Sequence, residues 1–378
     1  MPLLSPDNPP PCDGLDIAAF ARAFGNVNTS YKFFWARSLM AALDADGFQS
    51  RPVSFVRLAA GMLEAARRAV CIFRLRMPKD DKLAEWFLRL EGTPHWDGKT
   101  LARLKGNVIA PRARHIPGDI VEQLTKFVPY LFMSPFFDKA IPSGMVGKPK
   151  FRQIREEAAA RFDGDLPPPY CFADDAIIVH PKWAQYFRRN FEIINAWILW
   201  GLARYVQRIN PNVPGIAAKL DDAAAPKTTK QRQFWRQVMD SRPGVYCIYT
   251  GEKIDADNFA LDHYLPWSFV AHDNMWNLVP VSEAGNAEKS DNLPSGAEYF
   301  DLFAEMQNIA VQALHTFPNK SRWESIFEPY SADLNIDTFG AKIDGSELHS
   351  KLAEVINPLL AIAKTRGFKP DWEFDKAR

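Results

Sequence analysis

Cysteine is scarce in this chain, and its cysteines are widely separated. The 378 residues contain four, Cys12, Cys71, Cys171 and Cys247. No two of them form a CxxC pair, so the spacing indicates neither a zinc knuckle nor a disulfide framework. We therefore expect the chain to work in a reducing compartment, with the cytoplasm as its location.

Charge of one sign is also lacking. The formal net charge is +1 at pH 7 and the isoelectric point is about 7.7. A protein that wraps long stretches of duplex unaided normally carries a strong basic excess. Any affinity for nucleic acid must then come from local basic patches, from a metal ion or from a partner. Walker loops and GxGxxG patterns are absent as well, so nothing in the sequence indicates an ATPase.

Long apolar runs are missing. The most apolar stretch, residues 191–206, carries Glu192, Asn195 and Arg204 and is too short and too polar to span a bilayer. The first residues lack the basic start and apolar core of a signal peptide. We expect no membrane partner.

Helical patterning dominates both ends of the sequence. Apolar residues recur at helical spacing through most of the first 240 residues and again after residue 297. Asp97 to Lys105 is one of the shorter amphipathic candidates, and Ala176 to Val179 is expected to form a short strand. We predict a mainly α protein with an embedded α+β module. The expected divisions are a helical body at 1–240, the module at 241–296, and a helical segment at 297–378 that packs on the body.

The segment that carries chemistry begins after Gly244. Val245 to Tyr249 has the β-branched and aromatic character of a strand, followed by a turn. Asp262 and His263 stand next to each other in a second apolar stretch, and neighbouring side chains of a strand point to opposite sides. Residues 276–281 form another strand candidate. Ser282 then begins a helix in which Asn286 and Lys289 share a face. The expected unit is two strands and a helix, on which Asp262, His263 and Asn286 converge.

This set of side chains suits phosphodiester hydrolysis. The reaction needs a cation to neutralise charge on the phosphate and a base to activate water, and histidine titrates near neutrality. The carboxylate of Asp262 and the amide oxygen of Asn286 are hard ligands, which favour Mg²⁺, or Mn²⁺ in its place, over zinc. Lys289 is positioned to contact a phosphate.

The order of these short elements resembles the His-Asn-His (HNH) nuclease family, also called His-Me finger or ββα-metal nucleases. Within that family, residues 245–294 are most similar to the cutting module of the CRISPR RNA-guided effectors. The resemblance rests on a Cys-x-Tyr-x-Gly turn, an Asp-His-x-x-Pro-x-Ser core, a middle Asn and an Asn-x-x-Lys-Ser helix, here Cys247 to Gly251, Asp262 to Ser268, Asn277, and Asn286 to Ser290.

The resemblance assigns roles to these residues. His263 would be the general base, Asp262 and Asn286 the metal ligands, Asn277 an orienting residue and Lys289 a substrate contact. The products would carry a 5′-phosphate and a 3′-hydroxyl. This sequence has Asn286 where many relatives have histidine. It also keeps only Cys247 of their paired zinc cysteines, so no structural zinc is expected.

Basic clusters have a plain explanation beside the functional one. A charge run is usually a solvated surface, but Lys227, Lys230, Arg232 and Arg236 directly precede the module and are the best candidates for a surface that tracks phosphates. Two further clusters are left as solvated faces, Arg67, Arg68, Arg74 and Arg76, and Lys148, Lys150, Arg152 and Arg155.

Several other polar residues are interpreted as structural or solvated. His272 is expected to be a solvated surface residue, Glu283 and Glu288 a solvated helix face, and Cys247 a small core residue. The remaining histidines have no partners by spacing and are taken as structural, namely His95, His115, His180, His315 and His349.

Three functions remain open on the sequence. The favoured one is a Mg²⁺-dependent endonuclease acting on nucleic acid, with DNA preferred over RNA and a role in phage defence or restriction. The second is the nuclease subunit of a larger complex, or a homodimer, that is silent until a partner or guide presents the substrate. The third is a nucleic-acid-binding scaffold whose nuclease module has decayed.

Overall fold

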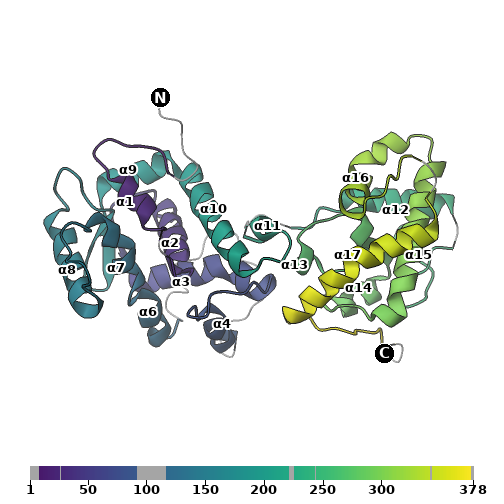
Figure 1. Cartoon of the computed structure of the whole chain (residues 1–378), viewed down its shortest axis with the longest axis horizontal. Coiled ribbons are helices and arrows are strands. Elements are labelled where there is room, and N and C mark those ends of the chain that lie inside the picture. Colours follow the sequence, from purple (N-terminus) through teal and green to yellow (C-terminus); the bar gives the residue numbers. More distant parts are fainter. Residues whose placement is uncertain are drawn as a thin grey trace. The chain divides into compact units, whose positions relative to one another are not determined.

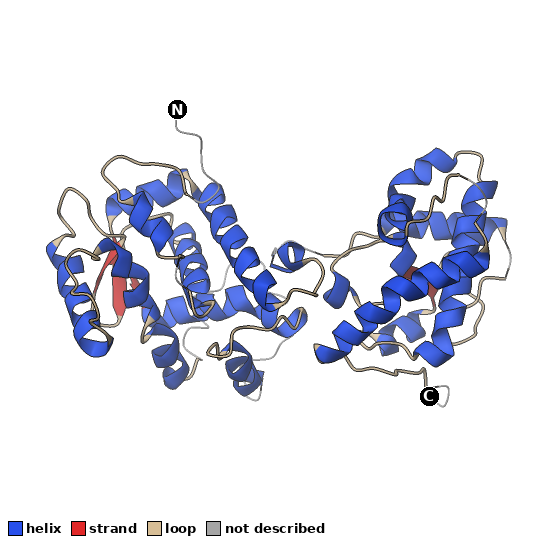
Figure 2. Ribbon diagram, viewed as in Figure 1, coloured by secondary structure: helices blue, strands red, loops and turns tan. Residues whose placement is uncertain are grey.

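The computed structural model describes residues 8–25, 27–91, 116–220, 225–242, 244–340 and 343–375. The chain divides into two compact units, Met1–Pro211 and Asn212–Arg378. Both are predominantly helical and each contains one small antiparallel sheet (Figures 1 and 2). None of the described helices is both long and apolar enough to cross a membrane.

The first unit is a bundle of helices with a three-stranded sheet. Its elements are α1 (Ile17–Arg22), α2 (Tyr31–Ala45), β1 (Pro52–Ser54), α3 (Phe55–Arg67), the π-helical turn η1 (Arg68–Ile72), α4 (Leu83–Glu91), α6 (Gly118–Thr125), α7 (Val128–Met133), η3 (Ser134–Phe136), α8 (Gly147–Ala160), β2 (Tyr170–Phe172), β3 (Ala176–Val179), α9 (Pro181–Arg189) and α10 (Phe191–Ile209). β3 is the central strand, with β1 and β2 antiparallel on either side of it.

Local sequence signals explain where these helices begin and end. Ser54 caps α3 by accepting a hydrogen bond from the N–H of Arg57 at 3.3 Å. The helix expected to start near Pro181 is interrupted at Asn190, so two helices, α9 and α10, replace the single long one. The strand expected at Ala176–Val179 is confirmed as β3. The helix expected at 97–105 lies outside the described residues.

Aromatic side chains fill the core of the first unit. The ring of Phe20 lies 5.7 Å from that of Trp183, 5.7 Å from Phe187 and 6.0 Å from Phe132. Phe20 and Trp183 are buried, as is Trp35 on α2. Helix α2 packs against α3 and α10. The abundance of aromatic residues is therefore used in packing, which stabilises this unit through burial of large apolar surfaces.

The second unit surrounds a two-stranded sheet with helices. Its elements are α11 (Ile216–Leu220), α12 (Thr229–Ser241), β4 (Ala260–His263), α13 (Trp267–Val270), η4 (Met275–Asn277), β5 (Leu278–Val281), α14 (Glu283–Lys289), α15 (Gly296–Thr316), η5 (Lys320–Trp323), α16 (Glu324–Leu334) and α17 (Gly345–Thr365). Within this unit the two strands are enclosed by helices (Figure 2).

The division of the chain differs from the one expected near residue 240. Helix α12 belongs to the second unit, where the ring of Phe234 lies 5.6 Å from Phe317 and 4.9 Å from Phe327. Gln307 on α15 donates a hydrogen bond to the carbonyl of Leu278 on β5 at 2.9 Å. The helices after residue 297 thus share one core with the strands. A strand pair and one short helix cannot bury their own apolar side chains, so the flanking helices complete that core.

The segment from Val245 to Tyr249 is not one of the named strands. A single bridge joins Tyr246 to Lys253, and the N–H of Cys247 donates to the carbonyl of Glu252 at 2.8 Å. Gly251, at a positive φ of 75°, closes the turn. The β-branched and aromatic residues here serve the core instead, since Val245, Cys247 and Tyr249 are all buried.

Candidate active site

The strand β4 carries the two adjacent residues on which the site depends. It pairs antiparallel with β5, so that Asp262 lies opposite Val279 and His263 opposite Leu278. Ser282 ends β5 and caps α14 by accepting from the N–H of Gly285 at 3.1 Å. The chain therefore runs strand, strand, helix in the order that the sequence predicted. Asp262 and His263 project to opposite sides of β4.

Asp262 is held by two donors in a nearly buried position. Its side chain is 5% exposed. One carboxylate oxygen accepts from the hydroxyl of Tyr249 at 2.7 Å and the other from the ammonium of Lys289 at 3.1 Å. Burial and then the charge of Asp262 raise the pKa of Tyr249 well above its usual value. The tyrosine is therefore a permanent donor, which fixes the carboxylate.

Lys289 is fully buried between the helix and the strand. Besides Asp262, its ammonium donates to the main-chain carbonyl of His263 at 2.7 Å. The sequence assigned Lys289 to substrate contact. Its ammonium is instead enclosed by its two acceptors and has no exposed surface, so in this structure it ties α14 to β4 and balances the charge of Asp262.

Asn286 lies one turn before Lys289 on α14. Residues three apart share a helix face, and α14 packs on β4, so Asn286 is on the side of the helix that faces Asp262. Its side chain is half-buried, and no hydrogen bond of its amide group occurs within the described residues. A half-buried amide without a protein partner is available as a ligand.

The donor set fits a hard divalent cation. Each oxygen of Asp262 accepts one hydrogen bond and keeps a further lone pair, and the Asn286 oxygen is an additional neutral ligand. Mg²⁺ takes few protein ligands and keeps several waters. Among the described residues, no group of three or more His, Cys, Asp or Glu side chains is arranged to hold a metal. Any site on Asp262 must therefore rely on the amide, water and substrate oxygens.

The ring of His263 is held by a residue that sequence reasoning missed. Its Nε2 lies 2.8 Å from a carboxylate oxygen of Asp273, and the side chain of His263 is 10% exposed. The other oxygen of Asp273 accepts from the main-chain N–H of Lys227 at 2.7 Å. Burial alone would raise the pKa of Asp273, but the hydrogen bonds from His263 and Lys227 outweigh it and bring the pKa below its usual value. Asp273 is thus an anionic acceptor for the imidazole.

Asn277 is buried and clamps the loop between the strands. Its side chain accepts from the N–H of Leu265 at 2.8 Å and donates to the carbonyl of the same residue at 2.9 Å. Its main-chain carbonyl also accepts from the N–H of Tyr264 at 2.9 Å. These contacts fix the backbone that follows His263, and they match the orienting role that the sequence suggested for Asn277.

The basic residues of α12 divide into two groups. Lys230, Arg232 and Arg236 each donate to an acceptor within the second unit, namely the hydroxyl of Ser325 and the carbonyls of Phe259 and Ala256. Lys227 is exposed, and its main-chain N–H reaches Asp273. Lys227 is therefore the member of the cluster that lies closest along the hydrogen-bond network to His263.

The remaining sequence candidates are placed as follows. His272 is half-buried, not solvated; its Nδ1 accepts from the N–H of Asn274 at 3.3 Å and its ring lies 5.3 Å from Trp276. Cys247 is buried in the core, with its sulfur 3.6 Å from the hydroxyl of Ser282. Glu283 is exposed, and Glu288 accepts from the N–H of Asp375.

Two other histidines have structural contacts. His180 caps α9, since its Nδ1 accepts from the N–H of Lys182. His349 lies 2.8 Å from Asp301 on the surface. His95 and His115 lie outside the described residues.

Comparison with known proteins agrees with the position of the site. A family model described as HNH endonuclease matches residues 247–295. Over 50 residues the chain is 42% identical to the CRISPR-associated endonuclease Cas9 of Listeria innocua, which is 12% of this chain and 4% of that relative. No solved structure matches the chain. The likeness is confined to the segment that contains Asp262, His263 and Asn286, and this segment carries the HNH endonuclease domain.

Proposed function

We propose that this chain is a Mg²⁺-dependent endonuclease that hydrolyses phosphodiester bonds in DNA, with Mn²⁺ able to replace Mg²⁺. The observation that carries the proposal is the separate support of two neighbours on β4. Asp262 is held by Tyr249 and Lys289, and His263 by Asp273. A carboxylate for a cation and an imidazole for a water molecule are thereby fixed on different sides of one strand.

His263 is the proposed general base. Since an ionised carboxylate only accepts, the Nε2 of His263 carries the proton in its bond to Asp273, and Nδ1 is left with its lone pair. Within the described residues Nδ1 has no hydrogen-bond partner. In the proposed reaction Nδ1 takes a proton from water, the resulting hydroxide forms a bond to phosphorus, and the bond to the 3′-oxygen breaks. The products carry a 5′-phosphate and a 3′-hydroxyl.

The proposed metal ligands are Asp262 and Asn286. When bound, a divalent ion supplies positive charge to the phosphate oxygens and to the departing oxygen. The residues of this chain prepare the site: Tyr249 and Lys289 orient the carboxylate, and α14 presents the amide of Asn286. Because the ammonium of Lys289 already neutralises part of the carboxylate charge, the site should hold its ion weakly until substrate oxygens complete the ligand set.

The decisive test is cleavage by the His263→Ala variant. We expect loss of cutting with folding and DNA binding retained. His349→Ala is the matched control, because His349 also bonds an aspartate through Nε2 at 2.8 Å but lies on α17. Both variants are assayed on labelled DNA and RNA with Mg²⁺, Mn²⁺, Ca²⁺ and Zn²⁺. Cutting by His263→Ala at the parent rate would show that the base is misassigned. Retained binding without cleavage by the parent in any metal would favour a decayed scaffold.

A second candidate function is the nuclease subunit of a larger assembly, including one used in phage defence. The near-neutral charge of +1 favours it, because the chain has little electrostatic excess with which to find DNA alone. The chain also spans only 4% of the length of the curated relative that it matches. Efficient digestion of plasmid by the purified chain with Mg²⁺ alone would rule out the need for a partner. A single site cuts one strand, so double-strand breaks would require two copies or two events.

A further inference from the structure

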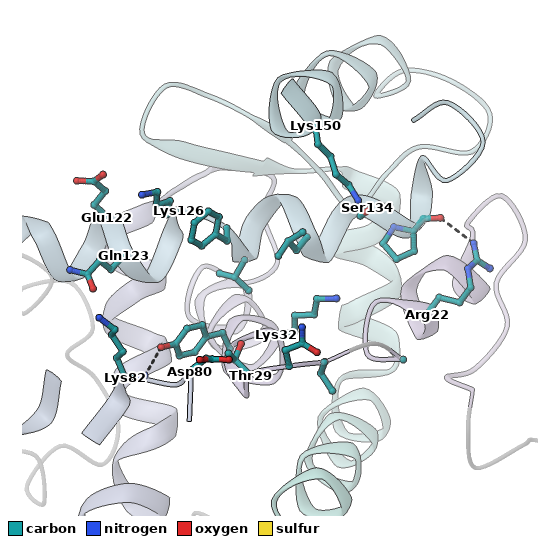
Figure 3. Close-up of a pocket in the computed structure, with 18 of the residues that line it drawn as sticks. Arg22, Thr29, Lys32, Asp80, Lys82, Glu122, Gln123, Lys126, Ser134 and Lys150 are labelled. Atoms are coloured by element: carbon teal, nitrogen blue, oxygen red, sulfur yellow. Dashed lines mark hydrogen bonds between the residues drawn. The ribbon is translucent and has the colours of Figure 1, made fainter. Parts of the chain in front are cut away.

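The first unit contains a cavity that the nuclease proposal does not use. Its volume is about 1300 Å³, and its lining comes from α2, α4, α6, α7 and the start of α8 (Figure 3). Pockets for small ligands usually measure about 300–1,000 Å³, so this one accommodates a ligand of nucleotide size. Asp262 and His263 are not part of it.

The lining has an unequal charge balance once its ion pairs are considered. Five cations face four carboxylates in the lining. Asp119 already accepts from Arg89 at 2.9 Å, and Asp138 lies 3.9 Å from Arg22. Four lysines then remain with two carboxylates, Asp80 and Glu122. The excess of positive charge suits an anionic ligand.

Two of these lysines come from distant parts of the sequence and meet at the cavity. Lys32 is on α2 and Lys150 on α8, and Figure 3 shows Lys150 reaching down toward the cavity with Lys32 below it in the same view. Burial, and then repulsion from Lys150, lower the pKa of Lys32. Two ammonium groups that disfavour each other are stabilised when a phosphate lies between them. Lys150 makes no ion pair within the described residues.

An apolar wall borders the same space. Phe127 and Leu131, one helical turn apart, are 48% and 37% exposed. The ring of Phe127 is supported by Phe151, whose centroid is 5.7 Å away and which directly follows Lys150. A supported aromatic ring with an open face is a stacking platform for a planar base. The platform and the lysine pair are therefore adjacent.

We propose that this cavity binds a free nucleotide, with its phosphates between Lys32 and Lys150 and its base against Phe127. Inorganic phosphate alone would use only the lysine pair. An extended nucleic-acid strand would need a basic track that continues beyond the cavity, whereas the cations are concentrated in its lining.

Calorimetric titration of the full chain tests the proposal. The probes are ATP, ADP, AMP, pyrophosphate and a 5′-phosphorylated single-stranded DNA. We expect nucleotide binding that Lys150→Gln weakens about tenfold or more, since a charge-assisted hydrogen bond is lost. Lys148→Gln is the matched control, because Lys148 is an exposed lysine on the same helix outside the lining. Phe127→Ala should weaken ATP binding about tenfold and leave pyrophosphate binding unchanged.

Several outcomes would overturn the proposal. These are no heat of binding for any nucleotide at millimolar concentration, equal loss in Lys150→Gln and Lys148→Gln, and binding of the oligonucleotide without binding of mononucleotides. Melting curves of each variant confirm that the fold is retained. Because none of these measurements uses DNA cleavage, failure of the nucleotide site and failure of the nuclease proposal are distinguishable.

Discussion

The imidazole of His263 and the carboxylate of Asp273 are joined by a hydrogen bond of 2.8 Å, ten residues apart along the chain. Asp273 is in turn fixed from α12: the N–H of Lys227 donates to its second oxygen, and the side chain of Gln231 donates to its main-chain carbonyl at 2.8 Å. The proposed base thus depends on a loop that a helix from outside the matched segment holds in place.

Asp273→Ala should lower the turnover number and leave the substrate's KM nearly unchanged. The variant keeps the imidazole but removes the acceptor that selects its tautomer and fixes its ring, an effect that typically costs about 10–100-fold. Asp273→Asn keeps an acceptor oxygen and should recover part of the loss. Steady-state cleavage kinetics measure both values. A rise in KM alone would assign Asp273 to substrate binding and not to positioning of His263.

The buried ion pair of Lys289 and Asp262 should matter for stability. Lys289→Met leaves Asp262 buried without its cation, and breaking such a pair by removing one partner costs about 3–5 kcal/mol. The surface pair Lys351 and Glu354 provides the control, and Lys351→Met should cost less than about 1 kcal/mol. Urea unfolding followed by circular dichroism gives both values. Adding Asp262→Asn to Lys289→Met should restore part of the stability. Equal stability of the two single variants would contradict a structural role for Lys289.

The sequence predicted the parts of the site that lie close together along the chain. Asp262 and His263 are neighbours on a strand, and the capping Ser282 sets the phase of α14, so their order was readable from local patterns. Asp273 and Tyr249 were missed because their roles depend on tertiary contacts with His263 and Asp262. The burial of Lys289 was missed for the same reason: helical spacing gives the face of a residue but not what covers it.

The domain boundary failed for a physical reason. Periodicity identified the helices on both sides of the module, but it does not tell which core a helix joins. Phe234 and Gln307 show that helices before and after the module complete its core. The cavity of the first unit was equally hidden, because Lys32 and Lys150 are far apart in sequence.

The stability of the second unit should fall on mild acidification because of His272. Burial is the main cause that lowers the pKa of His272 to about 4, and the charge of Asp333 only partly opposes it. As the pH falls from the usual histidine value of 6.5 toward 4, the unfolded chain takes up a proton that the folded chain does not. The stability lost over this window is at most about 3 kcal/mol.

Comparison of unfolding at about pH 7 and about pH 4.5 tests this dependence. His272→Asn is the variant of choice, because asparagine also accepts a hydrogen bond from the N–H two residues ahead and does not titrate. It should flatten the dependence in this window. Asp273, whose pKa is lowered, loses its contribution only at lower pH. An unchanged pH dependence in His272→Asn would refute the assignment.

Lys227 is the residue of the basic cluster most suited to contact a phosphate. Its contact with Asp273 uses the main-chain N–H, so Lys227→Ala removes the exposed ammonium and keeps that bond. In a His263→Ala background, we expect weaker DNA binding at every sequence and a slope of log K against log salt reduced by about one.

The control for Lys227 is an exposed lysine elsewhere in the module. Lys253 lines a small pocket with Met239 and Arg242, at the opposite end of α12. A helix of this length spans about 20 Å, so Lys253 is well separated from the start of α12. Lys253→Ala should leave the salt slope unchanged. If both substitutions reduce the slope equally, the loss reflects net charge alone, and DNA does not approach His263 along the start of α12.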